Sequence, residues 1–186
     1  MANKDAAFGL KAIGKVGQNR DNQGLSEYSI AASATAIYQN DPVEMLATGT
    51  IGVAAAGDVL LGSLNGVFYT DASTSKPTYA NHLEASNTAT DIVGFVADDP
   101  YERFEIQSAG TVAQTNIGNC ADIVYAAGAT PNYISKVEIS GTMAATAAQL
   151  KIIGVSKDPD NNELGAANAN VVVTIAEHFL TQTAGI

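Results

Sequence analysis

IVGFVADDP, residues 92–100, is the stretch that decides the fold of this chain, and it returns in altered form as IIGVSKDP, residues 152–159. Each copy is a short apolar run that carries one glycine and ends at Asp-Pro. A glycine inside a strand marks a bulge or a close approach to the backbone. Proline ends strand pairing because it has no N–H to donate, and an aspartate before it favours a turn. The sequence therefore predicts the same sheet-building unit twice.

Outside these two stretches the composition also favours strands. β-Branched residues gather in short runs, whereas strong helix formers never gather over three turns. Residues 103–107 alternate between charged and apolar side chains, which predicts that Phe104 and Ile106 face a core. Residues 170–178 are apolar on both faces, which is typical of a central strand.

Two local signals predict a turn and a helix. Asn65-Gly66 is the strongest hairpin signal in the chain. Residues 143–150 follow Gly141-Thr142 and are rich in alanine, so they are the best helix candidate, with room for one or two turns. Residues 71–77 are expected to form an exposed polar loop.

These observations predict a mainly β fold, an antiparallel β-barrel or β-sandwich with one or two short helices. Residues 1–24 are rich in glycine, asparagine and lysine, and their apolar residues have no regular spacing. We expect them to form an extended N-terminal arm and residues 25–186 to form a single β-rich body.

The charge of the chain is unevenly distributed. The formal net charge is −10, which argues against binding to nucleic acid or to anionic membranes. Four of the nine basic residues nevertheless lie in the first 20 positions, while residues 21–186 hold five basic and eighteen acidic side chains. Two interpretations stay open: a solvated, frayed terminus, or a basic arm that docks on an acidic neighbour.

The sequence contains no convincing catalytic or metal-binding pattern. His82 and His178 are far apart in the chain, and Cys120 has no neighbouring base, so we expect neither a metal site nor a nucleophile. The acidic run 158–163 lacks the spacing of a calcium loop, and Asp98-Asp99 with Glu102 is typical of a solvated turn. We therefore expect a protein that is not an enzyme and that needs no cofactor.

Cysteine usage and hydropathy indicate where such a chain is made. A single cysteine excludes an intrachain disulfide. The first 20 residues lack the apolar run of a secretory signal, and no stretch approaches the roughly 18 apolar residues of a membrane span. We expect a soluble protein made in a reducing compartment.

Several stretches taken together resemble the small capsid cement, or decoration, proteins of tailed phages, especially marine and cyanobacterial phages. They are residues 17–28, 37–43, 66–71, 92–107 and 148–155, beginning GQNRDNQGLSEY and ending AQLKIIGV. The resemblance implies a β-barrel or β-sandwich body, often a homotrimer, that is made in the host cytoplasm and binds the capsid exterior of the virion. Its partners would be copies of itself and the major capsid protein, whose subunits it would strap together.

The resemblance also assigns a role to the N-terminal arm. The arm would grip the capsid lattice, and the acidic body would face solvent. The predicted capsid-binding residues are the basic and apolar side chains of the arm: Lys4, Phe8, Leu10, Lys11, Ile13, Lys15 and Arg20.

Two other functions remain open at this point. One is another structural module of a virion or cell surface, such as a tail, head-fibre or adhesin-base protein. The other is a carbohydrate-binding or hydrolytic domain, which the absence of tryptophan disfavours although seven tyrosines leave room for stacking on sugars.

Overall fold

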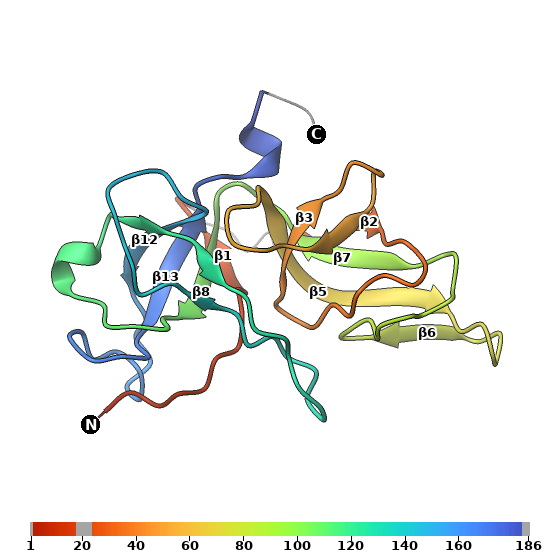
Figure 1. Cartoon of the computed structure of the whole chain (residues 1–186), viewed down its shortest axis with the longest axis horizontal. Helices are drawn as coiled ribbons and strands as arrows, with labels where there is room; N and C mark the ends of the chain where they lie inside the picture. The colour runs from red at the N-terminus through yellow and green to blue at the C-terminus, as the bar shows by residue number, and fades with distance from the viewer. Residues whose placement is uncertain (1, 18–23, 184–186) are drawn as a thin grey trace.

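The computed structural model describes residues 2–17 and 24–183, which fold into two antiparallel sheets and a short third ladder (Figure 1). The fold is mainly β, as predicted. The sheets do not close into a barrel, and their arrangement is sandwich-like. In Figure 1 the five-stranded sheet, called sheet A here, occupies the left half, and the six-stranded sheet B occupies the right half.

Sheet A has the strand order β1-β8-β13-β12-β9. Its strands are β1 (Lys11–Lys15), β8 (Glu102–Gln107), β13 (Asn170–Ile175), β12 (Leu150–Val155) and β9 (Cys120–Ala121). The predicted central position of the last strand is confirmed, because β13 pairs with β8 on one side and β12 on the other. The alternation in β8 is also confirmed: Phe104 and Ile106 are fully buried, and Arg103 is exposed.

Sheet B has the strand order β2-β7-β5-β3-β4. The sixth strand, β6, pairs with the second half of β5, whose first half pairs with β3. The strands of sheet B are β2 (Ser26–Ser29), β7 (Val93–Ala97), β5 (Leu60–Thr70), β3 (Pro42–Met45), β4 (Ile51–Val53) and β6 (Pro77–Ala80). A further ladder joins β10 (Ile123–Val124) to β11 (Glu138–Ile139), and two 3₁₀ turns, η1 (Gln114–Asn116) and η2 (Phe179–Thr181), are the short helices of the described chain.

Each sheet covers its own apolar core. The core of sheet A includes Phe104, Ile152 and Val173, and the core of sheet B includes Leu64 and Val96. Leu60 and Ala97 lie on strands of sheet B but pack into the core of sheet A, so the two cores meet along the ends of β5 and β7.

Two local predictions were wrong. Asn65-Gly66 does not form a hairpin: it lies inside β5, where the register against β7 shifts between Leu64 and Gly66, so the dipeptide makes a bulge. Residues 143–150 form no helix. Ala144 instead bridges Cys120, and Leu150 begins β12, because the side chains that follow bury on a sheet rather than on a helical face.

The loop expected at residues 71–77 is shorter than predicted. Residues 71–76 form a turn, and β6 begins at Pro77 and pairs with the second half of β5. Proline is tolerated there because β6 is an edge strand and the ladder ends at that residue.

No helix in the described ranges is long and apolar enough to cross a membrane.

Candidate interaction surfaces

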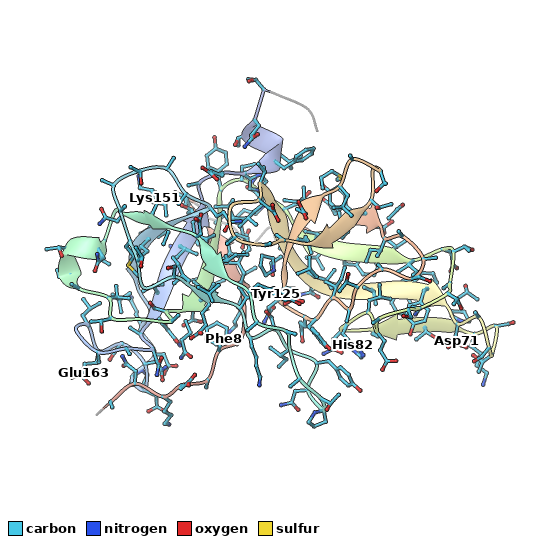
Figure 2. All side chains as sticks on the ribbon, viewed as in Figure 1. Phe8, Asp71, His82, Tyr125, Lys151 and Glu163 are labelled. Atoms are coloured by element: carbon cyan, nitrogen blue, oxygen red, sulfur yellow. The ribbon has the colours of Figure 1, made fainter. Side chains whose placement is uncertain are left out.

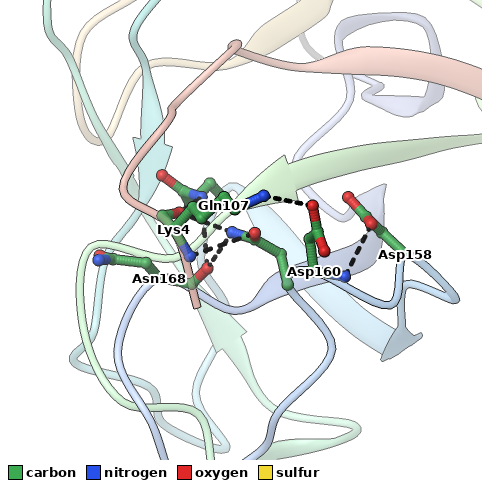
Figure 3. Close-up of polar contacts among 6 residues, drawn as sticks. Lys4, Gln107, Asp158, Asp160 and Asn168 are labelled. Atoms are coloured by element: carbon green, nitrogen blue, oxygen red, sulfur yellow. Dashed lines mark hydrogen bonds and ion pairs between the residues drawn. The ribbon is translucent and has the colours of Figure 1, made fainter. Parts of the chain in front are cut away.

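The described part of the N-terminal segment runs along the body and is fixed to it, and its residues 11–15 form a strand of sheet A (Figure 1). Three amide side chains hold residues 3–6: that of Asn3, which bonds to the backbone of Glu163 and Ala167, and those of Gln107 and Asn161. Buried Gln107 donates to the Lys4 carbonyl at 2.9 Å and accepts from the Ala6 N–H at 2.9 Å. Asn161 donates to the same Lys4 carbonyl at 2.7 Å and accepts from the Lys4 N–H at 3.2 Å (Figure 3). The Gln107 and Asn161 side chains each supply one donor and one acceptor to the backbone of the segment, as a neighbouring strand would.

The same segment is anchored again at residues 8–10. Gly9 has a φ of +78°, and a Cβ at this position would lie 2.4 Å from both the Asn40 carbonyl oxygen and the Ser135 Cβ. The Leu10 N–H donates to Asn40 O at 2.8 Å, and the Ser63 hydroxyl donates to Leu10 O at 2.5 Å. Glycine is therefore required where the segment passes between Asn40 and Ser135.

The structure separates the predicted capsid-binding residues into different environments. Leu10 is fully buried in the core of sheet A, so its side chain is not available to a partner. Lys4 pairs with Asp160 at 2.5 Å, and Lys15 pairs with Asp99 at 2.6 Å. Phe8 is half-buried, and Arg20 lies outside the described residues.

The ion pairs shift the pKa values of their members. The hydrogen bond from Lys15 lowers the pKa of Asp99, and the same contact raises the pKa of Lys15. The hydrogen bond to Asp160 raises the pKa of Lys4 in the same way. The described part of the arm thus behaves mainly as a strap across its own body.

Lys11 and Ile13, two more of the predicted residues, belong to a second exposed surface. They lie on the outer face of sheet A together with basic and aliphatic side chains from β8, β12 and β13. We call this surface the cationic face, and it comprises Lys11, Ile13, Arg103, Glu105, Lys151, Ile153, Lys157 and Val172. A cavity of about 420 Å³ lies over its centre, between Ile13, Ile153 and Val172.

The cationic face is basic although the protein is acidic. It holds four of the nine basic residues of the chain. Its one carboxylate, Glu105, accepts a hydrogen bond from Ser156 and lies 3.8 Å from Lys11. Arg103, Lys151 and Lys157 form no salt bridge within residues 2–17 and 24–183. Ile13 and Ile153 are 40% and 39% exposed, so the face also presents apolar surface.

The outer face of sheet B has a different character. Phe68, Tyr79, Val93 and Phe95 lie on it, and we call it the aromatic face, with Glu27 at its edge. Tyr79 is 75% exposed, and its ring lies 4.7 Å from Phe68 and 6.5 Å from Phe95, centroid to centroid. The strands β2, β5, β6 and β7 carry one charged side chain between them, Glu27.

The two faces belong to different halves of the molecule. Lys151 lies on the side of sheet A, and Asp71, at the end of β5, lies at the far end of sheet B (Figure 2). Sequence reasoning missed the cationic face. A signal for it was present, because the alternation that buries Phe104 and Ile152 turns Arg103, Lys151 and Ile153 outward.

The acidic residues at the ends of β7 and β8 act as structural acceptors. Asp98 accepts from the hydroxyls of Ser26 at 2.9 Å and Tyr28 at 2.6 Å. Glu102 is buried and accepts from the Gly14 N–H at 3.1 Å, and burial raises its pKa. No group of three or more potential metal-ligating side chains occurs in the described parts of the chain.

One buried carboxyl has no counterpart in the sequence-based expectations. Asp41 is fully buried and accepts from the Tyr38 N–H at 2.8 Å, while its Oδ1 atom has no partner within the described structure. Burial raises its pKa to about 6. His178 is also buried at the junction of the sheets: its Nδ1 accepts from the Leu180 N–H at 3.1 Å, and burial lowers its pKa.

No family model, no curated protein and no solved structure matches this chain.

Proposed function

We propose that this chain is a structural protein of a virus head, which binds the outer surface of the capsid and stabilises the contacts between subunits of the major capsid protein. The observation that carries the proposal is the presence of two separate exposed sheet faces, one cationic and one aromatic, on different halves of the described β body. A protein that holds neighbours together must make at least two contacts at once, and multiple weak contacts gain strength from their number.

The fixed N-terminal segment supplies a third surface, which the proposal assigns to the capsid. Residues 4–8 run along the outside of the body, where the side chain of Lys4 is 68% exposed and Phe8 is half-buried. Because the amides of Gln107 and Asn161 hold the backbone, binding there loses little conformational entropy. Capsid binding by the arm is thus proposed for Lys4 and Phe8, with the deeper residues holding the segment in place.

The experiment adds purified full-length chain to expanded, undecorated heads and measures occupancy by cosedimentation and cryo-electron microscopy. We expect density on the capsid exterior and a higher temperature of head rupture. Lys4→Ala should lower the affinity about two- to fivefold, which is the range for one exposed charged contact. Lys136→Ala is the matched control, because it removes one exposed lysine elsewhere on the body and should bind as the wild type does.

Two results would contradict the proposal at different levels. Density at the tail, or no binding to heads, would overturn the function itself. Equal binding of Lys4→Ala and wild-type protein would show that Lys4 of the N-terminal segment does not contact the capsid, and would not contradict the proposed function.

A further inference from the structure

The cationic face and the aromatic face are exposed surfaces on the two sheets of the described chain, and their charged side chains differ in sign: the first is mainly basic and the second carries the acidic residue Glu27. The cationic face presents Arg103, Lys151 and Lys157 around an aliphatic floor. The aromatic face presents the rings of Phe68 and Tyr79 beside Glu27, and Asp91 precedes β7 with its carboxylate exposed. Each face therefore lacks the groups that the other supplies.

Charge decides how copies of this chain can meet. If two cationic faces met across a twofold axis, the same four basic side chains would be brought together from both copies, with only the engaged Glu105 to offset them. If two aromatic faces met in that way, both copies of Glu27 would enter one contact in which strands β2, β5, β6 and β7 supply no basic side chain to offset them. Like charges placed opposite each other in a desolvated contact are unfavourable.

We infer that the cationic face of one copy binds the aromatic face of the next, in a head-to-tail contact between two copies of this chain. The inference rests on the proposed structural function and names the partner of two of its surfaces, the cationic face and the aromatic face. The aliphatic floor of Ile13, Ile153 and Val172 receives the rings of Phe68 and Tyr79. Arg103 and the lysines at the rim meet the faces of the rings and the carboxylate of Glu27.

The chemistry of such a contact follows the usual anatomy of protein interfaces. Aromatic and arginine side chains are enriched at the centre of interfaces, and charged groups are more frequent at the rim. Tyr79, at 75% exposed, has the most to bury of the aromatic residues on its face. A head-to-tail contact leaves one free face on each end of a pair, so further copies add, and they form a ring where the rotation between copies closes and an open filament where it does not.

A mixing experiment distinguishes this contact from every twofold alternative. Variant one, Lys151→Glu with Ile153→Asp, changes only the cationic face, and variant two, Phe68→Ser with Tyr79→Ser, changes only the aromatic face. In a head-to-tail contact each variant is monomeric alone, because every contact needs one intact face of each kind. Mixed in equal amounts, they form a one-to-one pair and nothing larger, because only one productive combination of faces remains.

The measurement is sedimentation equilibrium of the full-length protein at low salt, with circular dichroism and thermal melting of each variant to establish that it is folded. We expect wild-type oligomers, about a tenfold or greater loss of self-affinity in each variant, and recovery on mixing. Association should weaken as salt is added, because part of it is electrostatic.

Three outcomes would overturn the inference. They are a monomeric wild-type protein, a folded variant that self-associates as the wild type does, and a mixture that stays monomeric. The first outcome also covers the case in which an acidic segment of another protein occupies the cationic face. A monomer that decorates heads would refute the head-to-tail contact and keep the proposed function, whereas oligomers that ignore heads would do the reverse.

Discussion

Gly94 and Gly154 occupy equivalent positions in the two near-repeated stretches, yet the structure uses them in the two different ways open to a strand glycine. A Cβ on Gly94 would lie 3.0 Å from the tips of both Ile30 and Ile51 and 3.2 Å from that of Leu64. Gly154 lies in a bulge of β12, and a Cβ there would have nothing within 4 Å. Close packing therefore explains the glycine in the first copy, whereas a register shift of the strand explains it in the second.

These positions give a matched pair of substitutions. Gly94→Ala should lower the free energy of unfolding by about 1–3 kcal/mol, because the added methyl group overfills the core of sheet B. Gly154→Ala should leave it within about 0.5 kcal/mol, as for other open sites. Urea denaturation of both variants measures the difference. Equal losses in the two variants would show that the packing at Gly94 is not the reason for the glycine.

The buried carboxyl of Asp41 makes stability depend on pH. Its pKa is about 6 in the folded protein and near 3.8 in an unfolded chain, so the folded state binds more protons between these values. Its contribution to stability is present below about pH 4 and is lost as the pH rises through 6, by an amount on the order of 3 kcal/mol.

Asp41→Asn removes this titration. We expect the free energy of unfolding of the wild type to fall relative to that of Asp41→Asn as the pH rises from 4 to 7, measured by urea denaturation at each pH. The exposed and uncharged residue Gln114 gives a control, since Gln114→Ala should keep the wild-type pH profile. A constant difference between the Asp41→Asn and wild-type proteins across this range would contradict the assignment.

At the level of elements, the N-terminal segment depends on a small set of amides. Gln107→Ala leaves the Lys4 carbonyl and the Ala6 N–H with fewer partners in a partly buried site, and should destabilise the protein by about 1–3 kcal/mol. We expect residues 2–8 to exchange their amide hydrogens faster in this variant, as measured by mass spectrometry. Gln114→Ala, at an exposed position of η1, should change neither quantity. Unchanged hydrogen exchange of residues 2–8 in Gln107→Ala would mean that the Gln107 side chain does not hold the N-terminal segment in place.

The elements that the sequence predicted well are those whose signal is local and repeated. The alternation of β8 and the two-sided apolar pattern of β13 reflect which side chains are buried, and the polarity of each side chain indicates this directly in the sequence. The hairpin at Asn65-Gly66 failed because β5 continues through the dipeptide and pairs with β6 and β7, a choice made by partners distant in the chain. The attachment of the arm depends on Gln107 and Asn161. These residues are more than 100 positions from Lys4, and no pattern in the sequence around residue 4 indicates that they contact it.

At the level of the whole molecule, Leu10 is the point where the two sheets are joined through the N-terminal segment. Its side chain is buried in the core of sheet A, while its N–H and carbonyl bond to Asn40 and Ser63 beside and within sheet B. Leu60 and Ala97 extend the same junction from the strands of sheet B. The two halves should therefore unfold together.

Leu10→Ala tests this coupling. We expect a loss of about 2–5 kcal/mol, the range for a fully buried leucine, and equal losses of hydrogen-exchange protection in β8 of sheet A and β5 of sheet B. Val16→Ala is the control, because Val16 is 52% exposed and its truncation should have little effect. Loss of protection in β8 alone would show that the sheets are independent folding units.

The turn between β5 and β6 has a practical consequence. Asp71 accepts hydrogen bonds from the backbone and hydroxyls of Ser73 and Thr74, which lowers its pKa to about 2, and the turn closes on its own through the Asp71 N–H and the Lys76 carbonyl. Foreign peptides inserted at such self-contained, exposed tips disturb the host least. A guest epitope placed after Thr74 should be displayed at the end of the molecule remote from Lys151, without passing through either core.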